Sequence, residues 1–202
     1  MPGGPAREGA CQTALYGRLA ELVAGSEPVM CALRAARELD LDSWCIGAGL
    51  IRGLVWDHLH GFEEPSLCAD VDLVFYCPDG PGRMQERSIE QALSAMTPGL
   101  QWDAVNQAGV HRWLQPRSPG HVIPAFNSLA DGIASWPETA TCVGVTLNAM
   151  DEIGVIAPHG LSDLFDMVVR WNPARVSRTI YEERAAEKRW TARWPRVKVL
   201  PC

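Results

Sequence analysis

The stretch WCIGAGLIRGLVWDHLHGFEEPSLCADVDLVFY, residues 44–76, decides the expected fold. Its pattern predicts a strand, a glycine turn, a helix over 50–60, a loop and a second strand that ends at Tyr76. Asp70 and Asp72 stand two residues apart at the head of this second strand, so their side chains point to the same face. Two neighbouring carboxylates repel each other and carry a desolvation cost beside the apolar run that follows. A divalent cation between them would relieve that repulsion.

The glycine turn before the helix is the second chemical feature. Gly47, Ala48 and Gly49 let the backbone turn sharply from the first strand into the helix. The N-terminus of a helix is a natural place for a phosphate, because its first N–H groups have no partner within the helix. Arg52 follows on the first helical turn and could contact a phosphate, although a solvent-facing arginine is an equal alternative. A phosphate-binding turn next to metal-binding carboxylates predicts a nucleotide site.

Composition limits the class of protein. The 202 residues are 47% hydrophobic and 21% charged, which predicts an ordinary globular domain with a substantial core. A formal net charge of -6 argues mildly against a protein that grips long nucleic acids through their phosphates. The seven cysteines are irregularly spaced and form no C-x-x-C pair, so we expect reduced thiols and no zinc site. With no signal-peptide pattern and no long apolar run, we expect a cytoplasmic protein without a membrane partner.

Three segments are expected along the chain: a flexible tail over 1–10, a domain over 11–175, and a C-terminal helix with a basic tail over 176–202. Apolar spacing predicts helices over 12–23, after Ser26, 88–96, 106–113, 127–135, 161–170 and 177–190. Strands are expected over 100–106, 141–147 and 153–157, the last two as a hairpin.

The strand over 100–106 carries a third acid, Asp103, in its middle. The interval between Asp72 and Asp103 holds a turn, one helix and another turn, so the two strands can lie side by side. Three clustered carboxylates can hold two magnesium ions about 3.5–4 Å apart for displacement at phosphorus. The sequence therefore predicts a Mg²⁺ or Mn²⁺ site that uses a nucleoside triphosphate (NTP). Asn106 follows and could contact the base or the sugar, with capping of the next helix as an equal alternative.

These residues also carry a resemblance. G-A-G-L-I-R, then D-V-D, then a lone aspartate on a later strand resembles the nucleotidyltransferase superfamily of DNA polymerase beta and the CCA-adding enzymes. More closely, the chain resembles a family of small bacterial nucleotidyltransferase-like proteins, in the stretches AGLIRGLVWDHLHG (48–61), DVDLVFYCPD (70–79), WDAVNQAGVHRW (102–113), WPETATCVGVTL (136–147) and APHGLSDLFDMVVRWNP (157–173). The resemblance implies an α+β fold, in which helices flank a small mixed sheet that carries the three aspartates on neighbouring strands.

One departure from the superfamily pattern lies in the turn, which is usually Gly-Gly or Gly-Ser. This chain has Ala48-Gly49 instead, so a serine hydroxyl that could touch a phosphate is missing. Phosphate contact must then come from backbone amides and from other side chains.

The resemblance implies a metal-dependent enzyme that transfers a nucleoside monophosphate (NMP) from an NTP to an acceptor hydroxyl and releases pyrophosphate. Asp70 and Asp72 would hold both metal ions, and Asp103 the ion that activates the acceptor. The acceptor stays open between a small hydroxylated molecule, a tRNA and a protein. The alternative is a catalytically inactive nucleotide-binding or protein-interaction module of the same fold, against which the intact acidic triad speaks.

Other chemically active residues have simpler interpretations. We expect the lone histidines to be structural and Trp44, Trp56, Trp102 and Trp113 to belong to the core. Glu138, Thr139 and Thr141 could face the substrate, but composition does not decide this. The C-terminal basic and aromatic residues could track an RNA or bind a triphosphate, with a solvated helix end as the simpler alternative: Lys188, Arg189, Trp190, Arg193, Trp194, Arg196 and Lys198.

Overall fold

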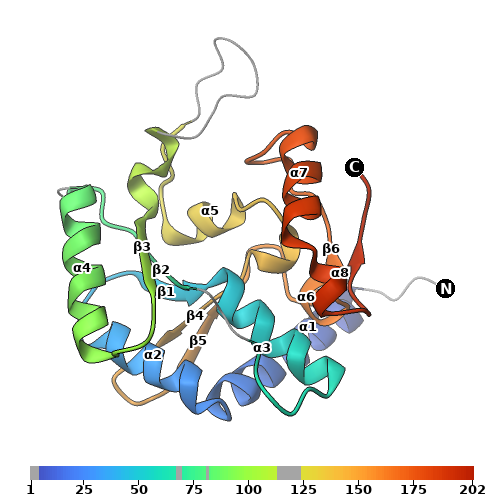
Figure 1. Cartoon of the computed structure of the whole chain (residues 1–202), viewed down its shortest axis with the longest axis horizontal. Coiled ribbons are helices and arrows are strands. Elements are labelled where there is room, and N and C mark those ends of the chain that lie inside the picture. Colours follow the sequence, from blue (N-terminus) through green and yellow to red (C-terminus); the bar gives the residue numbers. More distant parts are fainter. Residues whose placement is uncertain (1–4, 67–69, 81, 113–123) are drawn as a thin grey trace.

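The computed structural model describes residues 5–66, 70–80, 82–112 and 124–202 (Figure 1). A five-stranded sheet at its centre has the strand order β3-β2-β1-β4-β5. Strands β2 and β3 are parallel, whereas the other neighbours are antiparallel. The strands are β1 (Trp44–Gly47), β2 (Val71–Phe75), β3 (Trp102–Asn106), β4 (Gly144–Leu147) and β5 (Ile153–Ile156). The expected small mixed sheet is confirmed.

Helices surround this sheet (Figure 1). They are α1 (Pro5–Ala24), α2 (Glu27–Arg37), α3 (Ala48–His60), α4 (Arg83–Met96), α5 (Leu129–Ala134), α6 (Ser162–Phe165), α7 (Arg178–Lys188) and α8 (Trp190–Arg193), with 3-10 helices η1 (Gln107–Arg112) and η2 (Thr139–Thr141). A separate parallel pair joins β6 (Val168–Val169) to β7 (Lys198–Val199). Among the described helices, none combines the length and the hydropathy that a bilayer-spanning segment needs.

Alternation along β2 divides its side chains between two apolar clusters. Leu73 and Phe75 are buried in the main core, whereas Val74 packs in a smaller cluster with Ile133 of α5 and Trp136. Because side chains alternate along a strand, Asp72 shares the face of Val74. The sheet face that carries the acid is therefore covered by α5 at one end and open at the other.

Two glutamates of α4 accept hydrogen bonds from the backbone of the edge strand β3. The backbone N–H groups of Ala104 and Asn106 donate to Glu90 (3.2 Å) and Glu86 (2.9 Å). An edge strand leaves alternate N–H groups without a strand partner, and side-chain acceptors satisfy them here. These bonds fix the strand that carries Asp103.

Local patterns misplace some helix ends. Helix α1 begins at Pro5, inside the stretch expected as a flexible tail. The helix expected over 161–170 is wrong in its second half: α6 ends at Phe165, and Met167 adopts a left-handed backbone with φ 55°. The adjacent β-branched residues of β6 then pair with β7, which follows 30 residues later and is invisible to a local pattern.

The C-terminal residues expected as a solvated basic tail are folded into the main core. Trp190, Trp194 and Val197 are buried there together with Tyr181 of α7. Trp194 also donates a hydrogen bond from Nε1 to Asp57 of α3 at 2.7 Å. The simpler interpretation of this segment is therefore wrong for its tryptophans, which pack beside the central helix.

Candidate active site

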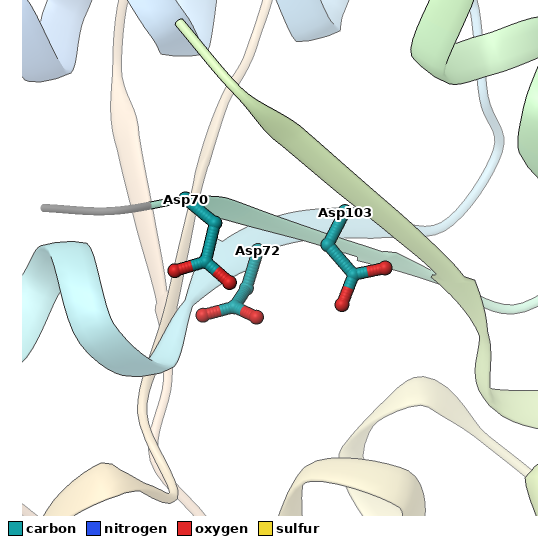
Figure 2. Close-up of side chains that lie close together, drawn as sticks. All are labelled: Asp70, Asp72 and Asp103. Atoms are coloured by element: carbon teal, nitrogen blue, oxygen red, sulfur yellow. The ribbon is translucent and has the colours of Figure 1, made fainter. Parts of the chain in front are cut away.

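Three carboxylates meet at the open end of the sheet (Figure 2). The parallel register of β2 and β3 places Asp72 beside Asp103, and Asp70 directly precedes β2. One carboxylate oxygen from each residue lies within 4.8 Å of the other two. The convergence that the spacing predicts is present in the structure.

This cluster is electrostatically unfavourable without a cation. Burial, followed by the charge of Asp70, raises the pKa of Asp72 to about 6. Burial and then the charges of Glu90 and Asp70 also raise the pKa of Asp103. Three carboxylate oxygens form a donor set that suits Mg²⁺ or Mn²⁺. The residues present therefore fit the metal that the sequence implies.

The glycine turn contacts the triad directly. The backbone N–H of Gly49 donates to Oδ2 of Asp72 at 3.4 Å. Ala48 adopts a left-handed backbone with φ 48°, which costs a non-glycine residue on the order of 1 kcal/mol. A methyl group added at Gly47 would lie 2.7 Å from the Trp136 ring and 2.9 Å from the carbonyl oxygen of Val143. Gly47 is thus required for packing, in addition to any phosphate contact.

Arg52 of α3 lies over aromatic rings instead of facing solvent. Its guanidinium carbon is 5.3 Å from the ring centroid of Trp56, 5.8 Å from that of Trp190 and 5.7 Å from that of Trp194. Its charge also lowers the pKa of Asp72, against the stronger effects that raise it. The C-terminal tryptophans therefore hold a cation within electrostatic reach of the triad.

The amide of Asn106 is used in structural hydrogen bonds. Its Oδ1 accepts from the backbone N–H groups of Cys77 (3.0 Å) and Ala108 (3.1 Å), and its Nδ2 donates to the carbonyl of Cys77 (2.7 Å). The bond to Ala108 caps the start of η1, so the structure favours the capping alternative. The proposed substrate site therefore does not include Asn106.

The neighbouring polar residues of α3 are also structural. Nδ1 of His60 lies 2.7 Å from the carbonyl oxygen of Trp56, and its Nε2 accepts from the backbone N–H of Arg196 at 3.1 Å. Asp57 is buried and accepts from the backbone and hydroxyl of Ser66, both at 2.6 Å. These contacts tie the loop after α3 and the C-terminal segment to the helix that bears the turn.

A cavity of about 1180 Å³ contains the triad. Asp70, Asp72, Asp103, Ala48, Gly49 and Arg52 line it together with Trp136, Glu138 and Thr141. Of the three residues that could face a substrate by sequence, Glu138 and Thr141 line the cavity, whereas Thr139 is not in its lining and donates a hydrogen bond to Asp163. Sequence reasoning missed two further cations that line the cavity, Arg175 and Arg184. Arg184 and Lys188 are four residues apart on a predicted helix, and this spacing was the available signal for a cationic helix face.

Comparison with known proteins agrees with this geometry. A nucleotidyltransferase family model matches residues 34–199. The chain is also similar to a solved protein whose NMR structure is described as revealing a CCA-adding enzyme head domain. That similarity has a TM-score of 0.75 and 26% identity, and it covers 91% of this chain and 95% of the other. No curated protein matches the chain.

Longer enzymes share the fold alone. A CCA-adding enzyme in an apo form aligns with a TM-score of 0.53 and 14% identity, over 90% of this chain and 44% of that one. A Thermotoga maritima CCA-adding enzyme complexed with tRNA aligns with a TM-score of 0.50 and 15% identity, over 84% of this chain and 37% of that one. This chain thus spans less than half the length of these two enzymes. The mixed sheet, the carboxylates on β2 and β3 and the match over most of the chain agree, and the chain belongs to this nucleotidyltransferase family.

Proposed function

We propose that the protein is a metal-dependent nucleotidyltransferase that transfers an NMP group from an NTP to an acceptor hydroxyl and releases pyrophosphate. The observation that carries this proposal is the convergence of Asp70, Asp72 and Asp103 within 4.8 Å in a chain of a nucleotidyltransferase family. The carboxylates share one cavity with the glycine turn, which supports binding of metal and phosphate at the same place.

Asp70 and Asp72 would hold Mg²⁺ or Mn²⁺, with Asp103 as the third ligand on the acceptor side. When bound, the metal would lower the pKa of the acceptor hydroxyl and neutralise part of the phosphate charge. The acceptor oxygen forms a bond to the α-phosphorus, and the bond from that phosphorus to the bridging oxygen breaks. The electron pair leaves with pyrophosphate, and the carboxylate of Asp103 accepts the hydroxyl proton.

The turn and Arg52 would bind the triphosphate. Gly49 already directs its N–H into the triad, and the first N–H groups of α3 are suited to an anionic oxygen. Arg52 would offset phosphate charge from its position over the tryptophan rings. Backbone amides thus replace the serine hydroxyl that the superfamily turn often provides.

The acceptor belongs to one of three classes: a small hydroxylated molecule, a tRNA or a protein. The net charge of -6 favours a small molecule or a protein over a long nucleic acid. Five described cysteines are free thiols, which supports a reducing cytoplasm as the compartment: Cys31, Cys45, Cys77, Cys142 and Cys202.

The test is to incubate the protein with each α-³²P-labelled NTP, Mg²⁺ and separate small-molecule, RNA and protein fractions of a cell extract. We expect label to move from the NTP to a product in one fraction, and Asp72→Asn to abolish the transfer. The labelled fraction identifies the acceptor class. Wild-type protein that transfers no label in any fraction, or Asp72→Asn protein that transfers as much as wild type, would refute the proposed enzyme and favour the inactive module.

A further inference from the structure

One side of the cavity is cationic and is built by residues that follow the last motif of the family resemblance. Arg175, Arg184 and Lys188 all line the cavity that contains the three carboxylates. Arg184 and Lys188 stand four apart on α7 and so share one face of that helix. We call these three residues the cationic wall.

Arg184 of the cationic wall is paired with a buried acid, Glu138. Glu138 is only 1% exposed and accepts an ion-paired hydrogen bond from Nε of Arg184 at 2.9 Å. The Thr141 hydroxyl donates to the backbone carbonyl of Glu138 at 2.8 Å, and its Oγ1 lies 3.3 Å from the other carboxylate oxygen. A buried carboxylate is costly unless it is paired, so Glu138 fixes the position of the guanidinium. A guanidinium has five N–H donors, and this bond uses one, so Arg184 can bind a second anion at the same time.

Arg175 brings a second guanidinium to the same place. Burial, and then the neighbouring charge of Arg184, lower the pKa of Arg175, whereas Glu138 acts in the opposite direction. Two guanidiniums thus lie within electrostatic reach of one carboxylate, with Lys188 on the same wall. The charge of Arg184 disfavours the charged form of Arg175, and an anionic ligand beside the two guanidiniums would relieve this repulsion.

The order of the sheet gives the direction from the triad to this wall. Asp103 lies on the edge strand β3, Asp72 on the next strand β2, and Gly47 at the end of β1. β4 lies on the other side of β1, away from β3. In Figure 1, β3 and α7 accordingly lie on opposite sides of the N-terminus of α3.

The glycine turn contacts the chain segment that contains Glu138. The backbone N–H of Ala48 donates to the carbonyl of Val143 at 3.3 Å, just before β4. Glu138 lies five residues upstream of Val143, and the ring of Trp136 packs against Gly47. The segment that contains Glu138 therefore contacts the turn on both sides of Glu138, and Ala48, Gly49 and the Glu138–Arg184 pair line one cavity with the triad.

Displacement at phosphorus requires the attacking and leaving oxygens to lie on opposite sides of the phosphorus atom. With the acceptor at Asp103, the leaving pyrophosphate points along the turn and away from β3. We propose that Arg175, Arg184 and Lys188 bind the β- and γ-phosphates of the NTP and hold the leaving pyrophosphate, with Glu138 as the residue that positions Arg184. This inference rests on the proposed nucleotidyl transfer and adds residues of the C-terminal part of the chain to the triphosphate site at the turn and Arg52.

The test compares the affinities of a non-hydrolysable NTP and of the matching NMP, which lacks the β- and γ-phosphates, by calorimetry in Mg²⁺. The variants are Arg175→Gln and the double variant Glu138→Gln/Arg184→Gln, in which a neutral hydrogen-bonded pair replaces the buried ion pair. Arg178→Gln is the matched control, because Arg178 is on α7 with its guanidinium over Trp171 and outside the cavity lining. Melting curves confirm that each variant is folded.

We expect the preference of the protein for NTP over NMP to fall about tenfold to a hundredfold in either variant, as the loss of a charge-assisted hydrogen bond implies. NMP affinity should stay at the wild-type value, and Arg178→Gln should retain the full preference. If wild type binds NTP but both variants keep its preference, or lose NMP affinity equally, the inference is overturned while nucleotidyl transfer stands. Wild-type protein that binds no NTP would overturn both. If the double variant is unfolded, Arg175→Gln alone decides the outcome.

Discussion

Replacing Asp72 with asparagine should stabilise the metal-free protein at neutral pH. Burial and the charge of Asp70 raise the folded-state pKa of Asp72 from 3.8 to about 6, so the ionised form is disfavoured in the fold. For an acid whose pKa is raised by folding, stability is highest below the unfolded value and falls as pH rises to the folded value. The two values are roughly two pH units apart, and each unit corresponds to about 1.4 kcal/mol. Ionised Asp72 therefore costs about 3 kcal/mol at most.

Asparagine is nearly isosteric, keeps an oxygen that can accept from Gly49 and removes this cost. Urea unfolding in EDTA at pH 7.5 should show Asp72→Asn to be more stable than wild type by about 1–3 kcal/mol. The difference should shrink as pH falls through about 6 and disappear near pH 3.8. Asp79→Asn is the control, since Asp79 is exposed and outside the cavity, and it should change stability by less than about 0.5 kcal/mol.

In the presence of Mg²⁺ and an NTP, wild type should be more stable than Asp72→Asn. Wild type should gain stability from Mg²⁺ with a non-hydrolysable NTP by mass action, and Asp72→Asn should lose most of that gain. A variant that is less stable than wild type in EDTA at pH 7.5, yet keeps the full stabilisation by Mg²⁺ and NTP, would refute the reasoning. It would show that the Asp72 carboxylate is a structural group.

Three further substitutions test separate parts of the site. Gly47→Ala should lower the free energy of unfolding by about 1–3 kcal/mol, because the added methyl meets the Trp136 ring and a backbone carbonyl. The control is Gly53→Ala in α3, where a methyl meets open space, and it should raise the free energy of unfolding by about 0.5–1 kcal/mol. Equal effects of the two substitutions in urea unfolding would contradict this. Arg52→Ala should weaken NTP binding by about 1.5–3 kcal/mol in a calorimetric titration, and unchanged affinity would remove Arg52 from the site. Asp57→Ala should lower the free energy of unfolding by on the order of 3 kcal/mol, because Ser66 and Trp194 lose their buried acceptor; wild-type stability would show these bonds to be dispensable.

The triad could be predicted from sequence because it depends on short-range geometry. Strand alternation puts Asp70 and Asp72 on one face. The connection from Asp72 to Asp103 is long enough to contain one helix, as the crossover between two parallel neighbouring strands requires. The turn at Gly47 was recognisable for the same reason, since glycines between a strand and a helix mark a local change of direction.

The remainder depends on contacts between distant segments. Trp56 lies four residues from Arg52 on the same helix and is a local contact. The other two rings, those of Trp190 and Trp194, come from more than a hundred residues away and have no local signature. Pairing of β6 with β7 likewise overrides the helical pattern after Phe165. The Glu138–Arg184 pair joins the start of η2 to α7. The sequence around Glu138 predicts only a loop, and that around Arg184 only a charged helix. For Asn106, both interpretations suited the sequence, and the hydrogen bonds to Cys77 and Ala108 favour the cap.

Binding of Mn²⁺ measured by electron paramagnetic resonance, with and without a non-hydrolysable NTP, tests the triad as a metal site most directly. Wild type should take up Mn²⁺, more tightly in the presence of the NTP, because substrate phosphates complete the coordination. Asp70→Asn, Asp72→Asn and Asp103→Asn should each lose this NTP-dependent uptake, whereas Asp79→Asn should bind as wild type does. Equal uptake of Mn²⁺ by wild type and by the three triad variants, with no effect of NTP, would contradict the assignment of these carboxylates as the metal site of a nucleotidyltransferase.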